Sequence, residues 1–211
     1  MAKRNTEKII LMKALDLFSV KGYTGVSVAD IAAAVGIKAA SLYKHFKSKQ
    51  DIFDSILKEA ADAYKQQAEK LAFDGLDHQS DAVVFQTMDL ENLVASGMAL
   101  FRFFLHEKTT AKLRRMLTIE QYDNQLAAEL LLKQYMSEPL AYQTAIFASF
   151  IEEGFMKDCD AEVAAAHFYS PLYLLLIQCD VFPEKEEEAL VFIEKHIKQF
   201  NKLYINGGES L

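Results

Sequence analysis

Hydrogen-bond donors and positive charges gather in one short stretch of the chain, KAASLYKHFKSK (residues 38–49). Ammonium and hydroxyl groups are common ligands of nucleic-acid phosphates, and small side chains let a helix approach base edges closely. The chain carries a formal charge of −7, yet residues 1–60 hold 10 Lys and Arg against 6 Asp and Glu. This asymmetry indicates a polyanionic partner for the N-terminal part, although charges that only solvate helix faces explain it as well.

Two apolar residues of this stretch, Leu42 and Phe46, are spaced as i and i+4 and are expected to face a core. The opposite side then exposes the groups that suit base edges: Lys38, Ala39, Ala40, Ser41, Lys44 and His45. Flanking residues are assigned to phosphates: Tyr43, Lys47, and Lys49, which stands in the first turn of the next helix. Packing between helices is the alternative role for Tyr43 and His45.

The residues around this stretch predict a helix-turn-helix. A helix over 5–21 carries one apolar stripe and ends at Gly22. Ser27 is expected to cap a second, short helix, with Asp30 completing a capping box, and Gly36 ends that helix. A third helix is expected over 38–46, and a fourth begins at Ser48. Two short helices joined by a glycine turn form the motif, which also occurs in proteins that never touch DNA.

The remainder of the chain predicts a larger helical body. Only 3 Pro and 8 Gly interrupt the sequence, and five or six further helices are expected after Gly75. Pro171 is expected to kink or divide the helix that contains it. Leu190, Ile193, Ile197, Phe200 and Tyr204 form a seam spaced 3, 4, 3 and 4. The seam indicates either a partner helix from a second chain or packing on the chain's own core.

The order ALDLFSVKGYTGVSVADIAAAVGIKAASLYKHFKSKQDIF resembles the DNA-binding head of TetR-type (TetR/AcrR) transcriptional regulators. The resemblance is dense over residues 8–57 and includes the Gly-Tyr pair, the Gly-Ile turn and the Leu-Tyr-Lys-His-Phe segment. One departure is Lys38, where many members have a Ser or Thr cap. Because Lys38 is not a usual N-cap residue, the residue at which the third helix begins is not fixed by the sequence.

This resemblance implies an all-α dimer that binds double-stranded DNA at a palindromic operator and is released by a small molecule. It divides the chain into a three-helix DNA-binding head, residues 1–50, and a ligand-binding and dimerisation body, residues 51–211. The DNA-binding set it supports is Ser27, Lys38, Ala39, Ala40, Ser41, Tyr43, Lys44, His45, Lys47 and Lys49. Family members typically dimerise through their last two long helices, which adds Leu172 and Leu175 to the seam residues as interface candidates.

The effector is expected to bind among apolar and aromatic residues of the body. Candidate residues are Met98, Phe101, Arg102, Leu105, Tyr122, Tyr142, Phe147, Phe150 and Ile151. Met98, Phe101 and Leu105 share one helix face, and Arg102 beside them suits an anionic group. Plain core packing is the alternative for each apolar residue, and a surface ion pair is the alternative for Arg102.

An enzyme is the competing class, and the sequence offers little for it. No Glu-x-x-His pair, Gly-x-Ser-x-Gly elbow or Gly-rich phosphate loop is present, so we expect no catalytic residues, metal or cofactor. Cys159 and Cys179 indicate neither a disulfide framework nor a metal site. The sequence favours a cytoplasmic protein without a membrane segment. A second alternative is a regulator-like protein that binds a small molecule or protein without sequence-specific DNA binding.

Overall fold

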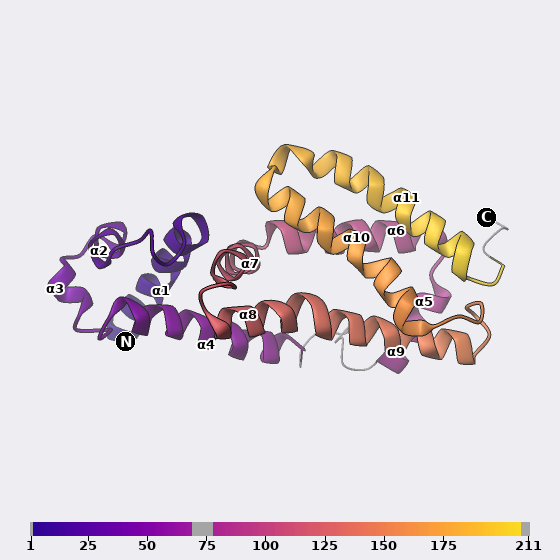
Figure 1. Cartoon of the computed structure of the whole chain (residues 1–211), viewed down its shortest axis with the longest axis horizontal. Coiled ribbons are helices and arrows are strands. Elements are labelled where there is room, and N and C mark those ends of the chain that lie inside the picture. Colours follow the sequence, from indigo (N-terminus) through magenta and orange to yellow (C-terminus); the bar gives the residue numbers. More distant parts are fainter. Residues whose placement is uncertain (1, 69–77, 208–211) are drawn as a thin grey trace. The chain divides into compact units, whose positions relative to one another are not determined.

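The computed structural model describes residues 2–68 and 78–207 of the chain (Figure 1). These residues form helices and no strand, and one isolated antiparallel bridge joins Met156 to Ile205. The expected all-α class is therefore confirmed. The helices are α1 (Ala2–Lys21), α2 (Val28–Val35), α3 (Ala39–Leu42), α4 (Lys49–Ala68), α5 (His78–Thr87), α6 (Leu90–His106), α7 (Lys108–Glu120), α8 (Gln125–Leu132), α9 (Glu138–Glu152), α10 (Ala161–Val181) and α11 (Glu186–Tyr204).

The body contains more helices than its sequence breaks indicate. Seven α-helices, α5 to α11, follow α4 in the described chain. The additional break falls at Asp89, whose side chain accepts a hydrogen bond from the Asn92 N–H and so caps α6. The expected break near Pro139 is instead a π-helical segment, Lys133–Ser137, that leads directly into α9. α10 remains one continuous helix across Pro171.

The chain divides into two compact units. The first unit holds residues 1–66 and 108–132, and the second holds residues 67–107 and 133–211. Helices α7 and α8 thus lie with the N-terminal helices, although about 40 residues separate α7 from α4 along the chain. The functional boundary expected after residue 50 is a different division from this one, and it stays a prediction.

The first unit is built around fully buried side chains of α1, α2, α3 and α4. They include Ile10, Ala14, Phe18, Ile31, Leu42 and Ile52. Helix α7 packs against α1 and contributes Met116 and Leu117, which are also fully buried. The apolar stripe of α1 and the i, i+4 pair of the third helix, Leu42 and Phe46, therefore face the core as the sequence indicates.

The second unit contains two hydrophobic clusters. One joins Phe147 and Phe150 of α9 to Ala164 and Ala165 of α10 and Phe200 of α11. The other lies between α6, α10 and α11 and includes Val94, Phe101, Leu176, Leu190, Ile193 and Ile197. Three of the seam residues of α11 therefore pack against α6 and α10 of the same chain.

Candidate nucleic-acid interface

Helix α2 has the caps that its sequence predicts. The Asp30 N–H donates to Ser27 Oγ at 3.1 Å, and the Ser27 N–H donates to Asp30 Oδ2 at 2.8 Å. The helix ends at Gly36, which adopts φ 80°, and the following Ile37 N–H donates to the Ala32 carbonyl at 3.0 Å. Both ends of α2 and the turn that follows it are thus fixed by local contacts.

Helix α3 is shorter than expected. It spans Ala39–Leu42, and the chain continues in turns to residue 45 instead of remaining α-helical to Phe46. Lys38 occupies the N-cap position without a side-chain hydrogen bond to the helix, because its ammonium has no acceptor to offer the free N–H groups of the first turn. Buried Leu42 and Phe46 anchor the segment to the core, so its other side faces solvent.

Most of the predicted DNA-binding residues are accessible. Exposed members are Ser27, Lys38, Ala40, Tyr43, Lys44 and Lys47, whereas Ala39, Ser41, His45 and Lys49 are half-buried. The Tyr43 side chain is 55% exposed, so packing between helices does not describe it. The exposed lysines and the Tyr43 hydroxyl form a surface with donors suited to phosphate oxygens.

His45 lies against α1. Its Nδ1 is 3.4 Å from Glu7 Oε1, and its side chain is only 14% exposed. Packing between helices, the alternative stated for this residue, therefore describes its side chain in the free chain. A direct contact of His45 with DNA stays a prediction.

Lys49 is bound to the turn between α1 and α2. Its Nζ donates to the Tyr23 carbonyl at 2.7 Å and to the Val26 carbonyl at 2.8 Å, and it lies 4.0 Å from the centre of the Tyr23 ring. The Tyr23 ring also packs edge-on against Phe53, at 5.0 Å between ring centres. Burial, followed by the charges of Asp54 and Glu120, raises the pKa of Tyr23. The phosphate role assigned to Lys49 stays a prediction.

The predicted effector residues of the second unit lie in two hydrophobic clusters, and Phe168 packs against both of them. Met98, Phe101 and Leu105 belong to the cluster of α6, α10 and α11, whereas Tyr142, Phe147, Phe150 and Ile151 belong to the cluster around α9. Tyr122 lies in the first unit and is 89% exposed. Arg102 Nε lies 3.9 Å from Glu186 Oε1, so the surface ion pair stated as its alternative is present.

The predicted dimer seam is largely covered within the single chain. Leu190, Ile193, Ile197 and Phe200 are buried, as the alternative of packing on the chain's own core expects, and their interface role stays a prediction. A seam pattern indicates that one face of a helix is covered, but it does not indicate which helix covers that face. Leu172 and Leu175 are half-buried against the same cluster, and the Tyr204 ring stacks on Phe200 at 4.5 Å.

A second stripe lies on the outer face of α10 and α11, and sequence reasoning missed it. On α11 it consists of Phe192, His196, Gln199 and Leu203, spaced 4, 3 and 4, and on α10 of His167, Pro171 and Leu174. Of these residues, Leu174, Phe192 and Leu203 are large apolar side chains that are at least half exposed. We call these seven residues the outer stripe. The signal that could have found it is this second set of seam spacings on α11.

A cavity of about 260 Å³ lies along the outer stripe, lined by His167, Pro171, His196, Gln199, Phe200, Leu203 and Tyr204. His167 Nδ1 is 2.7 Å from the Tyr204 hydroxyl, and His196 Nε2 donates to the Phe168 carbonyl at 2.8 Å. Both rings are therefore held by hydrogen bonds on one nitrogen.

The described part of the chain gives no indication of a metal site, a reactive thiol or a membrane span. Residues 2–68 and 78–207 contain no cluster of three His, Cys, Asp or Glu that could hold a metal ion. Cys159 and Cys179 are free thiols, and burial, reinforced by nearby carboxylates, raises the pKa of each. Among the helices that the structure describes, none is both long and apolar enough to span a bilayer.

Comparisons with known proteins agree with this geometry. Residues 10–56 match the family model "Bacterial regulatory proteins, tetR family". Over 203 residues, 96% of the chain and 89% of the other protein, the chain is 25% identical to a Bacillus subtilis (strain 168) protein named "Probable HTH-type transcriptional regulator YttP". Over 49 residues it is 51% identical to the "Biofilm operon icaADBC HTH-type negative transcriptional regulator IcaR" of Staphylococcus aureus (strain Newman), and this match spans 26% of IcaR.

The fold is also that of a solved regulator. The structure of a complex of SmeT with triclosan matches 98% of this chain and 95% of its own, with a TM-score of 0.63 at 18% identity. SmeT is described as the repressor of the Stenotrophomonas maltophilia multidrug efflux pump SmeDEF. Residues 10–56, with their capped helix-turn-helix, are thus similar to the DNA-binding domain of the tetR family of bacterial regulatory proteins, and the chain as a whole has the fold of a solved regulator.

Proposed function

We propose that the chain is a transcriptional repressor that binds a palindromic operator as a homodimer and leaves it when a small molecule binds. The observation that carries this proposal is the solvent-facing surface of α3 and its flanks, where Lys38, Tyr43, Lys44 and Lys47 are exposed above a buried Leu42 and Phe46. A surface of donors on the second helix of this motif suits the major groove of DNA. The curated relatives are regulators, so we assign no catalytic activity to the chain.

Different residues of this surface are assigned to bases and to phosphates. Ala40 and Ser41 are small and lie within α3, so they suit base edges, with Ser41 as donor or acceptor. Tyr43 and Lys47 stand just beyond the helix and suit the DNA backbone. The first group is expected to set sequence preference and the second to set overall affinity.

A second copy of the chain is proposed to cover the outer stripe of α10 and α11. Three large apolar side chains on this face, Leu174, Phe192 and Leu203, lie exposed in the single chain, and Leu203 also lines the cavity. An isologous contact of two such faces would form a four-helix arrangement with two-fold symmetry. Two heads related by that symmetry would read a palindrome with half-sites about 34–36 Å apart.

The effector is proposed to bind in the second unit. SmeT, which shares the fold, has been solved in a complex with triclosan. In this chain the second unit is rich in buried aromatic side chains, including Phe147, Phe150 and Phe200, which suit an apolar or aromatic compound. Apart from Tyr122, which lies in the first unit, the predicted residues from Met98 to Ile151 stay the candidates for this role, and we propose no cofactor.

Selection of bound duplexes from a random DNA pool tests the proposal. The purified chain is mixed with the pool at about 50 and 200 mM salt, because affinity that depends on phosphate contacts falls steeply over this range. Recovery of one palindrome with strongly salt-dependent affinity is the expected result. Sequence-independent retention would instead favour the alternative, a regulator-like protein without sequence-specific DNA binding.

A matched pair of lysine variants sharpens this test. Lys44→Ala removes an exposed cation beside α3, whereas Lys58→Ala removes an exposed cation on α4, outside the proposed surface. Lys44→Ala is expected to weaken binding of the selected palindrome at least about tenfold, and Lys58→Ala less than about twofold. Equal effects of the two substitutions would show that general positive charge, and not the surface of α3, accounts for DNA binding.

A further inference from the structure

The turn between α1 and α2, residues 22–26, is held by a buried carboxylate of α7. Glu120 Oε1 accepts a hydrogen bond from the Tyr23 N–H at 2.6 Å, and the Glu120 residue is only 7% exposed. These two residues are 97 positions apart in the chain. A buried carboxylate needs hydrogen-bond donors, and a backbone N–H that loses its acceptor in such a place is costly.

The contact is close because residue 22 is glycine. Gly22 has φ 69°, and a Cβ added there would lie 3.0 Å from Ile119 Cγ2 and 3.1 Å from Glu120 Oε1. Glycine therefore serves two requirements at this position, the left-handed backbone that ends α1 and the approach of the turn to the last residues of α7.

The other side of the turn is fixed by α4. Lys49 Nζ donates to the carbonyls of Tyr23 and Val26, and the next residue, Ser27, is the N-cap of α2. Glu120 and Lys49 thus bind the N–H and the carbonyl of the same residue, Tyr23. The direction in which the chain enters α2 depends on both contacts.

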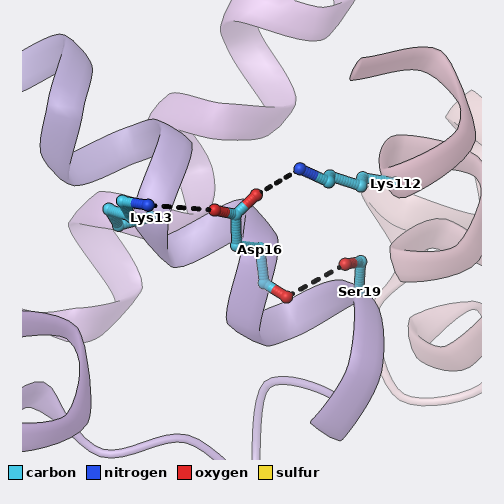
Figure 2. A network of polar contacts seen from close by, with 4 residues as sticks. All are labelled: Lys13, Asp16, Ser19 and Lys112. Carbon is cyan, nitrogen blue, oxygen red and sulfur yellow. Dashed lines mark hydrogen bonds and ion pairs between the residues drawn. The ribbon is translucent and has the colours of Figure 1, made fainter. Parts of the chain in front are cut away.

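A second contact joins the start of α7 to α1. Lys112 Nζ donates to Asp16 Oδ1 at 2.5 Å, and Asp16 Oδ2 lies 3.6 Å from Lys13 Nζ. Figure 2 shows Asp16 between the two lysines, with the Ser19 hydroxyl bonded to the Asp16 carbonyl. Lys112 and Glu120 are about 12 Å apart along the helix axis, so α7 is attached to α1 and to the following turn at two separate points.

Helix α7 is also directly connected to the second unit through the peptide chain. α6 ends at His106 and α7 begins at Lys108, so a single residue, Glu107, joins them. The helix that binds the α1–α2 turn is therefore the element of the first unit that follows α6 in the chain.

We infer that Glu120 is a positioning residue for DNA binding: it fixes the α1–α2 turn, and with it α2 and α3, to α7. This inference rests on the proposed operator binding for its consequence, but the contact itself can be measured without DNA. Loss of the Glu120 acceptor frees the Tyr23 N–H and lets the turn move, which broadens the orientation of α2 relative to α1. Specific binding needs one orientation, whereas binding to phosphates alone does not.

Three substitutions at Glu120 test this role. Glu120→Ala removes the acceptor, Glu120→Asp withdraws it by one methylene, and Glu120→Gln keeps an oxygen in the same place. Glu129→Ala is the matched control, because Glu129 is an exposed carboxylate of α8 in the same unit that accepts a hydrogen bond from Gln125. Two quantities are measured well below each variant's unfolding temperature: hydrogen exchange of the Tyr23 amide without DNA, and affinity for the selected palindrome and for unrelated duplex.

Glu120→Ala and Glu120→Asp are expected to speed exchange of the Tyr23 amide and to weaken palindrome binding, each about tenfold, since a lost hydrogen bond to a charged group is worth roughly that factor or more. Affinity for unrelated duplex should change less than about twofold, because the phosphate-binding groups are retained. Glu120→Gln should behave like the unsubstituted chain, as should Glu129→Ala. A residue that only stabilised the fold would lower the unfolding temperature without changing the ratio of the two affinities.

Slow exchange of the Tyr23 amide together with unchanged palindrome affinity in Glu120→Ala would overturn the inference. If Glu120→Ala does not fold, the same two measurements are made on Glu120→Asp, and the same combination of results would overturn the inference. A chain that selects no palindrome would remove the proposed function, and the amide exchange would then still decide whether Glu120 fixes the turn.

Discussion

The ammonium of Lys49 lies 4.0 Å from the centre of the Tyr23 ring and donates a hydrogen bond to the Tyr23 carbonyl at 2.7 Å. A lysine that sequence reasoning assigned to a DNA phosphate is thus bound inside the head. The two roles are compatible in principle, because an ammonium has three donors and the turn uses two of them. The two roles predict different effects of substitution on the stability of the chain without DNA: loss of a phosphate contact leaves it unchanged, whereas loss of the contacts to the turn lowers it.

Lys49→Ala is expected to lower the free energy of unfolding by about 1–3 kcal/mol, because it leaves two carbonyls without a charged donor. Lys47→Ala is the control, since Lys47 is exposed, and it should change stability by less than about 0.5 kcal/mol. Urea unfolding followed by circular dichroism measures both. If Lys49→Ala leaves both palindrome affinity and its salt dependence unchanged, Lys49 has no phosphate role.

Tyr43→Phe and Ser41→Ala are expected to affect DNA binding in different ways. Tyr43 is 55% exposed beyond the end of α3, so loss of its hydroxyl should weaken binding to all duplexes by a similar factor, about two- to tenfold. Ser41 lies within α3, so its substitution should change the ranking of operator variants. Competition binding against a panel of single-base operator variants distinguishes the two. An unchanged ranking with Ser41→Ala would exclude base contact by Ser41.

Phe192→Asp is expected to weaken dimer formation at least about tenfold, because a charge on a buried apolar interface is left unpaired. Phe192 is 50% exposed on the outer stripe. Leu100→Asp is the control, since Leu100 is also exposed, but on α6. Sedimentation analysis over a range of concentrations gives the dissociation constants. Equal constants for the two variants would place the interface elsewhere.

The neighbouring residue Ile193 provides a contrast within the same experiment. Ile193 is fully buried against α6 and α10, so Ile193→Ala should lower the free energy of unfolding by about 2–5 kcal/mol. The folded fraction should still form dimers with nearly unchanged affinity, because the outer stripe is retained.

Gly22→Ala is expected to destabilise the chain more than Gly36→Ala. Both glycines have positive φ, 69° and 80°, so both substitutions carry the backbone cost of about 1 kcal/mol. Only at Gly22 would the new methyl approach other side chains, Ile119 and Glu120, whereas nothing lies within 4 Å at Gly36. Denaturant unfolding of the two variants measures the difference. Equal losses would show that α7 moves aside without cost.

The capping box of α2 predicts a dependence on pH. Two hydrogen bonds from Ser27 lower the pKa of Asp30 below its ordinary value of 3.8. The bond from the Ser27 side chain has the larger effect, and the bond from the Ser27 backbone N–H has the smaller one. The ionised form is the one that the folded state favours, so its contribution to stability is complete above pH 3.8 and is lost as the pH falls through the lowered pKa.

Asp30→Asn removes this contribution. The difference in unfolding free energy between Asp30→Asn and the unsubstituted chain should be present near pH 6 and shrink below about pH 3.8. Urea unfolding at several pH values measures this difference, and a carboxyl titration followed by NMR gives the pKa itself. A pKa of Asp30 at or above its ordinary value would contradict the capping contact.

The head could be predicted in detail because its signals are local. Ser27 and Asp30 are three residues apart, and Leu42 and Phe46 are about one helical turn apart. Gly36 ends α2 and lies in the turn that follows this helix. Each pattern depends on backbone geometry within a few residues, so the order of the sequence carries it. The length of α3 was less well predicted, because no cap marks its start and turns continue past Leu42.

For the body, the sequence predicted helices but not their packing. Periodicity indicates that one face of a helix is covered, but it does not identify the element that covers it. α11 carries two stripes, and the tertiary structure decided that Ile193 and Ile197 face α6 while Phe192 and Leu203 stay exposed. It also decided that Lys49 binds the α1–α2 turn and that Glu120, 97 residues away, binds the Tyr23 N–H. Such contacts depend on where separate helices are placed in space, and no spacing within one helix encodes that placement.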